Sequence, residues 1–358
     1  MSLSTVNSFT NWGKLKEVWL GDVYPSHFYD HLESQVRDVF YELTEKTQQD
    51  LNTIQSKLQE FGVDVVRPKY HKIDDFISPN GHPHHPNTLM KPQITPRDHF
   101  LAHGNKLFYP PWLAQPWQSA LDRYAADAGS QLIPEITLVH LGSLSGANTV
   151  RIGKDLYLDV FHVQQHSQMN LLQQEFDRKI KPYFVGSRLH LLNNGGHVDG
   201  CFAAIKPGLL LTSRYFSDYD RTFPGWEQIN IAKPEFSNNR HKKNTPNVNG
   251  KFWFAGASNN QAFNDHVIKH ALDWVGNYTE TFFEVNCLVV DEKNVLMLGE
   301  NDAVFRALER HGITAHSLPF RTRTFWDGGL HCLTLDIRRE DSPVDLFPSR
   351  DQSVYYYS

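Results

Sequence analysis

The sequence predicts an α/β fold in which one small module is used several times around a common centre. Two observations indicate this. A helix that ends at a glycine and runs directly into a strand occurs near both ends of the chain, and a turn that leads into a short apolar strand occurs four times. Because turn-and-strand patterns of this kind are common, an ordinary mixed α/β enzyme without internal symmetry stays open as the alternative.

The helix–glycine–strand unit is found at 51–68 and again at 301–319. In each case apolar residues recur at helical spacing, a glycine suited to a left-handed C-cap follows, and an alternating strand then ends at proline. The second helix is expected to begin at a cap formed by Asn301 or Asp302. The residues expected to face the core are Leu51, Ile54 and Leu58 in the first helix and Val304, Phe305 and Leu308 in the second.

The turn-plus-strand element places a tight turn before a short run of apolar and aromatic residues. Its four copies lie at 104–109, 153–158, 207–211 and 293–298. The segment 235–265 is rich in Asn, Lys, Ser and Gly, and is expected to be a loop or insertion rather than a linker between domains. The length allows two ordinary domains or one large repetitive domain, and we expect a single domain that spans residues 1–358.

The composition is that of a folded protein without a nucleic-acid partner. Hydrophobic residues make up 40% of the 358 residues and charged residues 21%, which suits a sizeable core. The net charge of -5 and the lack of a basic tract argue against nucleic acid. No apolar run approaches the ~20 residues of a membrane span, and the N-terminus lacks a secretion-signal pattern, so we expect no membrane partner.

The three cysteines, Cys201, Cys287 and Cys332, are widely spaced and form no CxxC pair. An odd and scattered set argues against a disulfide framework and for a reducing compartment. A cytoplasmic protein is therefore expected.

Cys332 follows a glycine pair, Gly328 and Gly329, at the point where a strand is expected to begin. The glycines let the backbone turn tightly and bring a substrate close, and the β-favouring residues after Cys332 would hold the thiol in place. A cysteine presented in this way is typical of a nucleophile, provided that a histidine and carboxylates converge on it. A lone cysteine is more often a small core residue, and we expect that role for Cys201 and Cys287.

Residues that suit such a site lie in three loops that precede expected strands, at 95–100, 144–153 and 193–200. The third loop contains His197 and Asp199, whose i, i+2 spacing would place both side chains on one face of an extended strand. His197 offers a proton shuttle near neutral pH, and Asp199 offers a fixed negative charge. Asp98, in the first loop, supplies a second carboxylate.

Two carboxylates that face a thiol suit a planar cation such as a guanidinium, whose donors they can match bidentately. A positive charge about 4 Å from the thiol contributes about 4 kcal/mol at an effective dielectric near 20, which is roughly three pKa units. A bound guanidinium would thus ionise Cys332, whose free pKa would be about 8.5, and leave His197 to protonate the departing amine. Taken alone, His197 and Asp98 are each explained by a structural role; their combination in loops of this kind favours a site.

A second cluster, His82, His84 and His85, has the composition of a metal site. The flanking prolines and the lack of suitably spaced Cys, Asp or Glu favour an exposed loop instead, and we expect no metal. Phe325 and Trp326, just before Cys332, suit either a pocket wall or the core.

Taken in order, these motifs resemble the amidinotransferases of the guanidino-group-modifying superfamily, with glycine amidinotransferase as the nearest pattern. The likeness runs almost end to end, and its parts are 7–21, Pro96-Arg97-Asp98 through Gly104-Asn105, His197-Val198-Asp199, Asp291-Glu292-Lys293, Gly328-Gly329-Leu330-His331-Cys332 and Asp336-Ile337-Arg338-Arg339. The Gly-Gly-x-His-Cys form is closer to the transferases than to the arginine deiminases.

The resemblance implies a pseudo-fivefold α/β propeller (a pentein) of ββαβ-type modules, with the site on its axis. It implies that Cys332 attacks the guanidino carbon of arginine to give a covalent amidino-cysteine, with ping-pong kinetics. His197 would act first as acid and then as base, while Asp98 and Asp199 would hold the guanidinium. Arg214 is the nearest candidate for a residue that grips the donor carboxylate, although it lies a little away from the expected position.

The resemblance implies no cofactor and no metal. The partners it implies are a small guanidino donor and a primary-amine acceptor, and a homodimer is the family-level expectation. None of the motifs encodes the identity of the acceptor.

The chain departs from the family in the second loop, where Ser145 and Asn148 occupy positions that are acidic in relatives. Ser145 can accept a hydrogen bond from an imidazole but adds no charge, so the pKa of His197 is expected to be lower than in relatives. Asp155 or Asp159 would compensate if either reached the site. Two other functions therefore stay open: a guanidino-group hydrolase of the same superfamily, and a guanidino-binding protein with weak catalysis.

Overall fold

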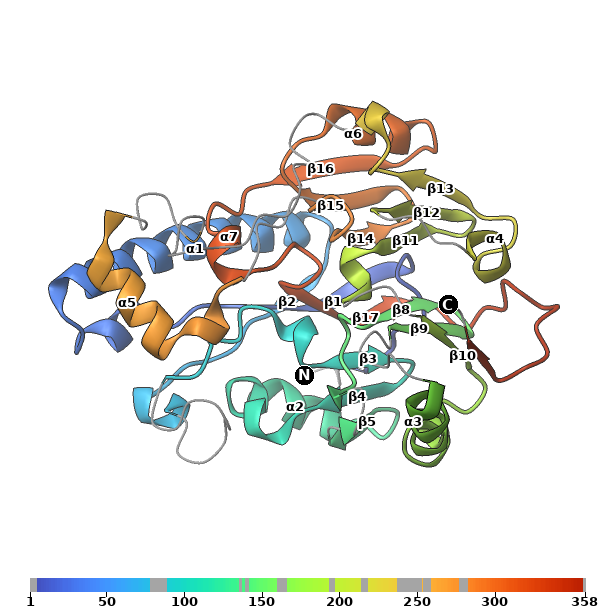
Figure 1. The fold of residues 1–358 in the computed structure, drawn as a ribbon, viewed down its shortest axis with the longest axis horizontal. Helices are drawn as coiled ribbons and strands as arrows, with labels where there is room; N and C mark the ends of the chain where they lie inside the picture. The colour runs from blue at the N-terminus through green and yellow to red at the C-terminus, as the bar shows by residue number, and fades with distance from the viewer. Residues whose placement is uncertain are drawn as a thin grey trace.

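The computed structural model of the chain describes residues 5–77, 89–134, 137–138, 142–159, 166–192, 197–213, 218–236, 253, 259–276 and 283–356. Five sheets within these ranges share one pattern, in which a first strand pairs antiparallel with a second and a third strand joins the second in parallel. A parallel neighbour requires a crossover connection, and a helix lies in this connection in each sheet (Figure 1). The predicted α/β fold with a repeated module is therefore confirmed at the level of the individual sheets.

Four of the modules follow one another along the chain. They are β3 (Leu101–His103), β4 (Lys106–Tyr109), α2 (Gln118–Ala125) and β5 (Gln131–Pro134); β8 (Thr149–Ile152), β9 (Asp155–Asp159), α3 (His166–Lys179) and β10 (Arg188–Leu192); β11 (Phe202–Lys206), β12 (Leu209–Thr212), α4 (Tyr219–Thr222) and β13 (Glu227–Asn230); and β14 (Leu288–Asp291), β15 (Asn294–Leu298), α6 (Asp302–Glu309) and β16 (Thr314–Leu318). Additional strands are β18 (Val354–Tyr356), which extends the sheet of β10, and the pair β6 (Thr137–Leu138) and β7 (Gly142–Ser143).

The fifth module joins the two ends of the described chain. Its first strand is β17 (Thr334–Glu340), and β1 (Lys14–Leu20), α1 (Ser34–Glu60) and β2 (Asp64–Val66) complete it. In Figure 1, β1 and β17 lie near the middle of the view, between the sheet of β14–β16 above and that of β3–β5 below. The turn that carries Cys332 leads directly into β17, so this cysteine lies just before the pair formed by β17 and β1.

The predicted repeats correspond to equivalent parts of the modules. The four turn-plus-strand copies contain β4, β9, β12 and β15, which are the middle strands of their sheets. Both helix–glycine–strand units are present as α1 with β2 and α6 with β16, and Gly62 and Gly312 each have a φ of 73°. Glycine adopts this left-handed conformation without the strain that a Cβ would cause.

The helix predictions are confirmed in their cores and corrected at some ends. Asn301, rather than Asp302, caps α6, since its Oδ1 accepts from the Val304 N–H at 3.3 Å. The expected loop at 235–265 is wrong for its last residues, because Asn260 caps α5 (Gln261–His270); residues 237–252 and 254–258 lie outside the described ranges. The side chains predicted to face the core are buried apart from Phe305, which is half-buried; the buried ones are Leu51, Ile54, Leu58, Val304 and Leu308.

Candidate active site

Cys332 lies in a tight turn immediately before β17. The Thr334 side chain donates to the Leu330 carbonyl at 2.9 Å and closes this turn. A side chain at Gly329 would collide with Asn286, because an added Cβ would lie 2.4 Å from the Asn286 Oδ1. The turn therefore requires glycine, and it leaves 6% of Cys332 exposed.

Asn286 holds Cys332 at both its backbone and its thiol. Asn286 Nδ2 donates to Cys332 Sγ at 3.0 Å, and Asn286 Oδ1 accepts from the Cys332 N–H at 3.1 Å. The motifs did not predict this residue, although the repeat offered a signal. Asn286 lies just before β14, the first strand of its module, as Asp98, Asp199 and Cys332 lie just before the first strands of theirs.

Asp199 connects the thiol to a neighbouring histidine. Cys332 Sγ donates to Asp199 Oδ2 over 3.5 Å, and His331 Nδ1 lies 2.9 Å from the same oxygen. Burial, assisted by the charge of Arg97, lowers the pKa of His331 to about 4. Burial also raises the pKa of Asp199, but the hydrogen bond to His331 and nearby positive charges outweigh this and hold the pKa below its usual range. A lowered pKa favours the ionised form of Asp199 beside the thiol, which is consistent with the role expected for this residue.

His197 and Asp98 form a more open part of the site. His197 Nδ1 lies 4.0 Å from Asp98 Oδ1, and the side chains are 53% and 17% exposed. The expectation that His197 and Asp199 share one face of a strand is wrong, because Val198–Gly200 form a 3-10 turn in which next-but-one residues point in different directions. The charge of His197 still acts on Asp199, so the turn keeps the two residues in one site.

Each of the two carboxylates has a buried oxygen, Asp98 Oδ1 and Asp199 Oδ1, with no hydrogen-bond partner among the described residues. A buried carboxylate oxygen that lacks a donor is energetically unfavourable. A guanidinium carries five N–H donors in a planar fork and would satisfy both oxygens at once. The pair is therefore chemically suited to a planar cation next to Cys332.

Arg97 fixes the loop of Asp98 and the loop of Cys332 to each other. Its Nε donates to the carbonyl oxygens of His331 and Thr334 at 2.7 and 2.8 Å. Arg97 itself is 2% exposed and immediately precedes Asp98. A shift of one loop would break buried hydrogen bonds to the other, so the relative position of carboxylate and thiol is set by the backbone.

A buried carboxylate anchors this arginine. Asp336 on β17 accepts hydrogen bonds from Arg97, Arg151 and Arg339, and all four residues are 1–2% exposed. Burial raises the pKa of Asp336, but the three guanidinium groups outweigh it and hold the pKa well below its usual range. The network is buried and is connected to the cysteine turn through Arg97.

The second loop contacts the site through its backbone. The Ala147 N–H donates to the Arg97 carbonyl at 3.1 Å, and the Ala147 carbonyl accepts from the Asp199 N–H at 3.3 Å. Ser145 is 3% exposed and Asn148 is half-buried. The structure thus places both predicted residues in a loop that packs on the site, and neither brings a charge to it.

Asp155 does not compensate for this neutral loop. Its carboxylate accepts from Arg188 and lies 2.6 Å from His190 Nε2, and these partners with Arg350 hold its pKa at about 2 against the effect of burial. Asp159 bonds through its backbone N–H to the Asn148 carbonyl at 2.9 Å. The predicted residues that lie outside the described ranges are Arg214, His82, His84 and His85.

The other two cysteines are core residues, as expected. Burial raises the pKa of the Cys287 thiol to about 12, and Cys201 is 2% exposed. Phe325 and Trp326 are fully buried and belong to the core rather than to an open pocket wall. In the described part of the chain no group of three or more His, Cys, Asp or Glu side chains could bind a metal ion, and no helix is long and apolar enough to cross a membrane.

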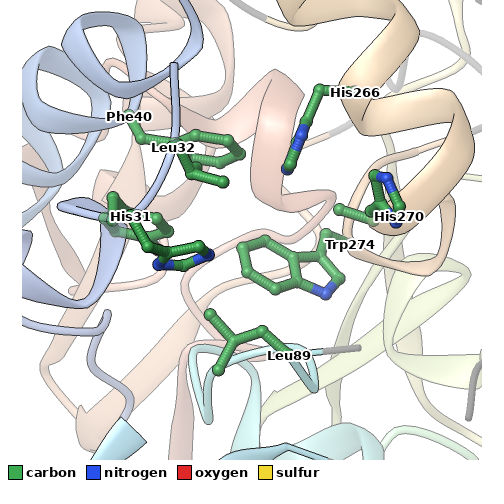
Figure 2. Close-up of a pocket in the computed structure, with 9 residues that line it drawn as sticks. His31, Leu32, Phe40, Leu89, His266, His270 and Trp274 are labelled. Atoms are coloured by element: carbon green, nitrogen blue, oxygen red, sulfur yellow. The ribbon is translucent and has the colours of Figure 1, made fainter. Parts of the chain in front are cut away.

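A cavity of about 310 Å³ lies beside α1 and α5 and is separate from Cys332 (Figure 2). Aromatic and apolar side chains form most of its wall, together with three histidines; the lining residues are Tyr29, His31, Leu32, Phe40, Leu89, His266, His270, Ala271 and Trp274. Trp274 stacks on Trp326 with ring centroids 6.2 Å apart. One wall residue of the cavity, Trp274, therefore contacts a residue that precedes the cysteine turn.

Solved structures of two amidinotransferases and of DDAH share this fold. SxtG, an amidinotransferase from Microseira wollei in saxitoxin biosynthesis, has a TM-score of 0.65 at 18% identity over 96% of this chain and 99% of that one. The inosamine-phosphate amidinotransferase StrB1 from Streptomyces griseus has a TM-score of 0.62 at 20% identity over 95% and 98% of the two chains. DDAH from Pseudomonas aeruginosa has a TM-score of 0.50 at 12% identity.

Sequence comparison gives amidinotransferases as well. The chain is 24% identical to inosamine-phosphate amidinotransferase 1 of Streptomyces griseus over 328 residues, which cover 82% of this chain and 81% of the relative. It is 21% identical to the L-arginine:L-lysine amidinotransferase of Pseudomonas savastanoi pv. phaseolicola over 199 residues, which is 55% of this chain but only 44% of that relative. No known family's sequence profile matches the chain. The chain is therefore similar to amidinotransferases in both sequence and fold, and the resemblance predicted from its motifs is confirmed.

Proposed function

We propose that this protein is an amidinotransferase that moves an amidino group from arginine, or from a close guanidino donor, to a primary amine. The observation that carries the proposal is a pair of buried carboxylate oxygens, on Asp98 and Asp199, which find no donor among the described residues. They accompany the thiol of Cys332, which Asn286 and Asp199 hold. A guanidinium supplies these donors and its central carbon would lie within reach of the sulfur.

In the first half-reaction the guanidinium takes Asp199 as its partner, and the thiol of Cys332 loses its proton to water. The thiolate then attacks the guanidino carbon, and a carbon–sulfur bond forms. The bond from that carbon to the side-chain nitrogen of the donor breaks, and the His197 imidazolium protonates the departing amine. Ornithine leaves if arginine is the donor, and the amidino group stays on Cys332.

In the second half-reaction a primary amine takes the place of ornithine. His197, now neutral, accepts a proton from this amine as its nitrogen attacks the amidino carbon. The carbon–sulfur bond breaks and Cys332 returns as a thiolate, so the overall kinetics are ping-pong. Arg214 stays our candidate for the donor carboxylate, and Ser145 and Asn148 are proposed to line the binding site.

We also propose that the five modules form the single domain expected for residues 1–358 and surround a central axis as a pentein propeller. The support is that Asp98, Asp199, Asn286 and Cys332 occupy equivalent places before the first strands of four modules. Residues at equivalent places of a ring converge on its centre, which is where a site built from four loops is required. A homodimer of such domains is the remaining proposal from the resemblance.

Intact-protein mass spectrometry after incubation with arginine, without an acceptor, tests the proposed chemistry. We expect the mass of one amidino group to be added to the wild type and to Cys201→Ala, but not to Cys332→Ala. Added primary amines should then discharge the adduct and appear as amidino products. An adduct that persists in Cys332→Ala would contradict the assignment of the nucleophile.

The same experiment separates the two other functions. Citrulline or ammonia released without any amine would identify a hydrolase, to which the shared fold with DDAH gives limited support. Stabilisation of the protein by arginine, without adduct or product, would identify a guanidino-binding protein. Either result would overturn the proposed transfer.

A further inference from the structure

We propose that His331 is a positioning residue for the donor site: its neutral imidazole holds one oxygen of Asp199 beside the thiol of Cys332, and leaves the other oxygen and the whole negative charge to a cationic guanidino donor. The selection of a charged donor rests on the proposed function. The pairing of His331 with Asp199 does not, because it can be measured in the protein without a substrate.

The two oxygens of the Asp199 carboxylate have different surroundings. His331 Nδ1 lies 2.9 Å from Oδ2, and the Cys332 thiol donates to the same oxygen over 3.5 Å. Oδ1 is buried and accepts no hydrogen bond from any residue that the structure describes. The contacts therefore occupy one oxygen and leave the other without a donor, and this second oxygen is the one that we assign to the guanidinium.

The hydrogen of the shorter contact is assigned to His331 Nδ1. Burial raises the pKa of Asp199, but the hydrogen bond with His331 and nearby positive charges outweigh it, so that the ionised form is favoured. An ionised carboxylate has only acceptors, and the nitrogen that faces it must then carry the hydrogen. The geometry thus selects the tautomer of His331 that is protonated on Nδ1.

The surroundings of His331 also keep its ring neutral. Burial lowers the pKa of His331 to about 4, with help from the charge of Arg97, and the carboxylates of Asp199 and Asp336 oppose this only in part. A cationic side chain in this place would pair with Asp199 and cancel its charge. A neutral donor instead satisfies the buried oxygen and leaves the negative charge to attract a guanidinium.

The backbone on either side of the imidazole is held by hydrogen bonds. The His331 N–H donates to the Asn286 carbonyl at 3.2 Å, and the His331 carbonyl accepts from Arg97 Nε at 2.7 Å and from the Thr334 N–H at 3.1 Å. The side chain of His331 is 8% exposed. The ring therefore has a defined position from which to fix the carboxylate.

The charges that act on this pair determine how donor binding should depend on pH. Arg97 acts on both residues, His197 acts on Asp199, and Asp336 acts on His331. If the imidazole is removed, the effect of burial on Asp199 is less opposed and its pKa rises. A guanidinium binds the ionised carboxylate, so its affinity should be lost at a higher pH, as the pH falls, than with His331 present.

The pairing itself is tested by nitrogen NMR of the full chain with labelled histidine, in which the His331 signals are assigned from His331→Asn. We expect a neutral ring protonated on Nδ1 from about pH 8 to about pH 5.5. Asp199→Asn should weaken this preference, because an amide can donate as well as accept. A ring protonated on Nε2, or one that gains a second proton near pH 6, would overturn the pairing.

The role of the pairing is tested by calorimetric binding of arginine and of its neutral analogue citrulline to Cys332→Ala, which cannot form an adduct. Adding His331→Ala should weaken arginine binding about tenfold at neutral pH, and more at lower pH, because a hydrogen bond to a charged group is lost. Citrulline binding should change little. His331→Asn should restore most of the arginine affinity, since its amide N–H can replace Nδ1–H. His316→Ala, which removes a contact with Asn294 on another module, should bind like the parent.

Three results would overturn the proposal: equal losses for arginine and citrulline, a His331→Asn variant that binds no better than His331→Ala, or arginine binding in His331→Ala with unchanged strength and pH dependence. The third result together with a lowered free energy of unfolding would make His331 a structural residue only. If Cys332→Ala with His331 intact binds no arginine, the proposed function fails, while the nitrogen signals still decide the pairing.

Discussion

Asn286 and Cys332 are joined by two hydrogen bonds, from the Asn286 amide nitrogen to the sulfur at 3.0 Å and from the Cys332 N–H to the amide oxygen at 3.1 Å. One side chain thus fixes the backbone that carries the thiol and donates to the sulfur itself. A donor of this kind stabilises a thiolate more than a thiol. Asn286 is buried and lies on a different module from the cysteine, so the thiol is held in place by a contact between modules.

Asn286→Ala should therefore slow the reaction of Cys332. Loss of a hydrogen bond to a charged group is worth about 2 kcal/mol, or about 30-fold in rate. Asn286→Asp should be slower still, because it replaces the donor by a carboxylate that repels the thiolate. The measurement is the rate of Cys332 alkylation by iodoacetamide across pH. Asn294→Ala, in which the lost amide contacts Asp291 and His316 instead, should react like the wild type.

Gly329→Ala should disturb the same contact from the other side. An added Cβ would lie 2.4 Å from Asn286 Oδ1 and 2.5 Å from its Cγ, so the amide must move. We expect a loss of about 1–3 kcal/mol in the free energy of unfolding, which is typical of overpacking, and a drop of at least about tenfold in adduct formation. Urea unfolding and mass spectrometry measure the two effects.

Gly200→Ala is the matched control for this change. Gly200 is the neighbour of Asp199, but an added Cβ there would meet no atom within 4 Å. Its adduct formation should equal that of the wild type. Equal stability and equal adduct formation in the Gly329 and Gly200 variants would show that the cysteine turn tolerates a side chain. The close contact with Asn286 would then not explain why residue 329 is glycine.

The sequence was sufficient to predict the elements of the fold that depend on local chemistry. Glycine caps and alternating strands mark α1 with β2 and α6 with β16 because these signals act within a few residues. The pairing of β1 with β17 joins residues such as Leu20 and Thr334 from opposite ends of the chain. No local signal specifies such a partner, so this pairing was not predicted.

Residues of the candidate site could be predicted where the residue type itself indicates a chemical role. Cys332, Asp199, Asp98 and His197 were chosen as candidates because thiol, carboxylate and imidazole groups are distinctive in glycine-flanked loops, and their roles stay proposals. Asn286 was missed because a single Asn before a strand is common, and its role depends on the contact across modules. The 3-10 turn at Val198–Gly200 was also missed, since its glycine and its i, i+2 pattern suit an extended strand equally well.

Asp336→Ala should be one of the most destabilising single changes in the protein. It would leave three buried guanidinium groups, those of Arg97, Arg151 and Arg339, without their shared carboxylate. Breaking a buried ion pair costs about 3–5 kcal/mol, because the remaining charge stays desolvated. Urea unfolding measures the loss. The control is Glu340→Gln on the same strand, which removes only the ion pair with Lys16 at the surface. This variant should unfold at the same urea concentration as the wild type. An equal loss of stability in the two variants would contradict a structural role for the network.

The stability of the protein should fall as the pH drops below about 6.5, because buried histidines stay neutral in the fold. Burial, with help from nearby positive charges, lowers the pKa of His103 to about 3 and that of His331 to about 4. The unfolded chain binds a proton on each below about 6.5, whereas the folded chain does not until much lower pH. The full free energy of unfolding is thus present at a pH above the pKa of histidine in the unfolded chain. Below that pKa, each of these histidines lowers the free energy of unfolding by about 1.4 kcal/mol per pH unit.

Urea midpoints at pH 7, 6 and 5 measure this slope, and His103→Gln tests its origin. His103 Nε2 lies 3.1 Å from Ser187 Oγ, and glutamine retains a polar group for that contact without the proton-binding ring. Between pH 6.5 and 5 the free energy of unfolding of the variant should fall less steeply than that of the wild type. The difference in slope should correspond to one proton, which is about 1.4 kcal/mol per pH unit. The alternative outcome is that the urea midpoints of wild type and variant change with pH by the same amount. His103 would then bind its proton equally well in the folded and unfolded chain, which would contradict a lowered pKa for His103 in the fold.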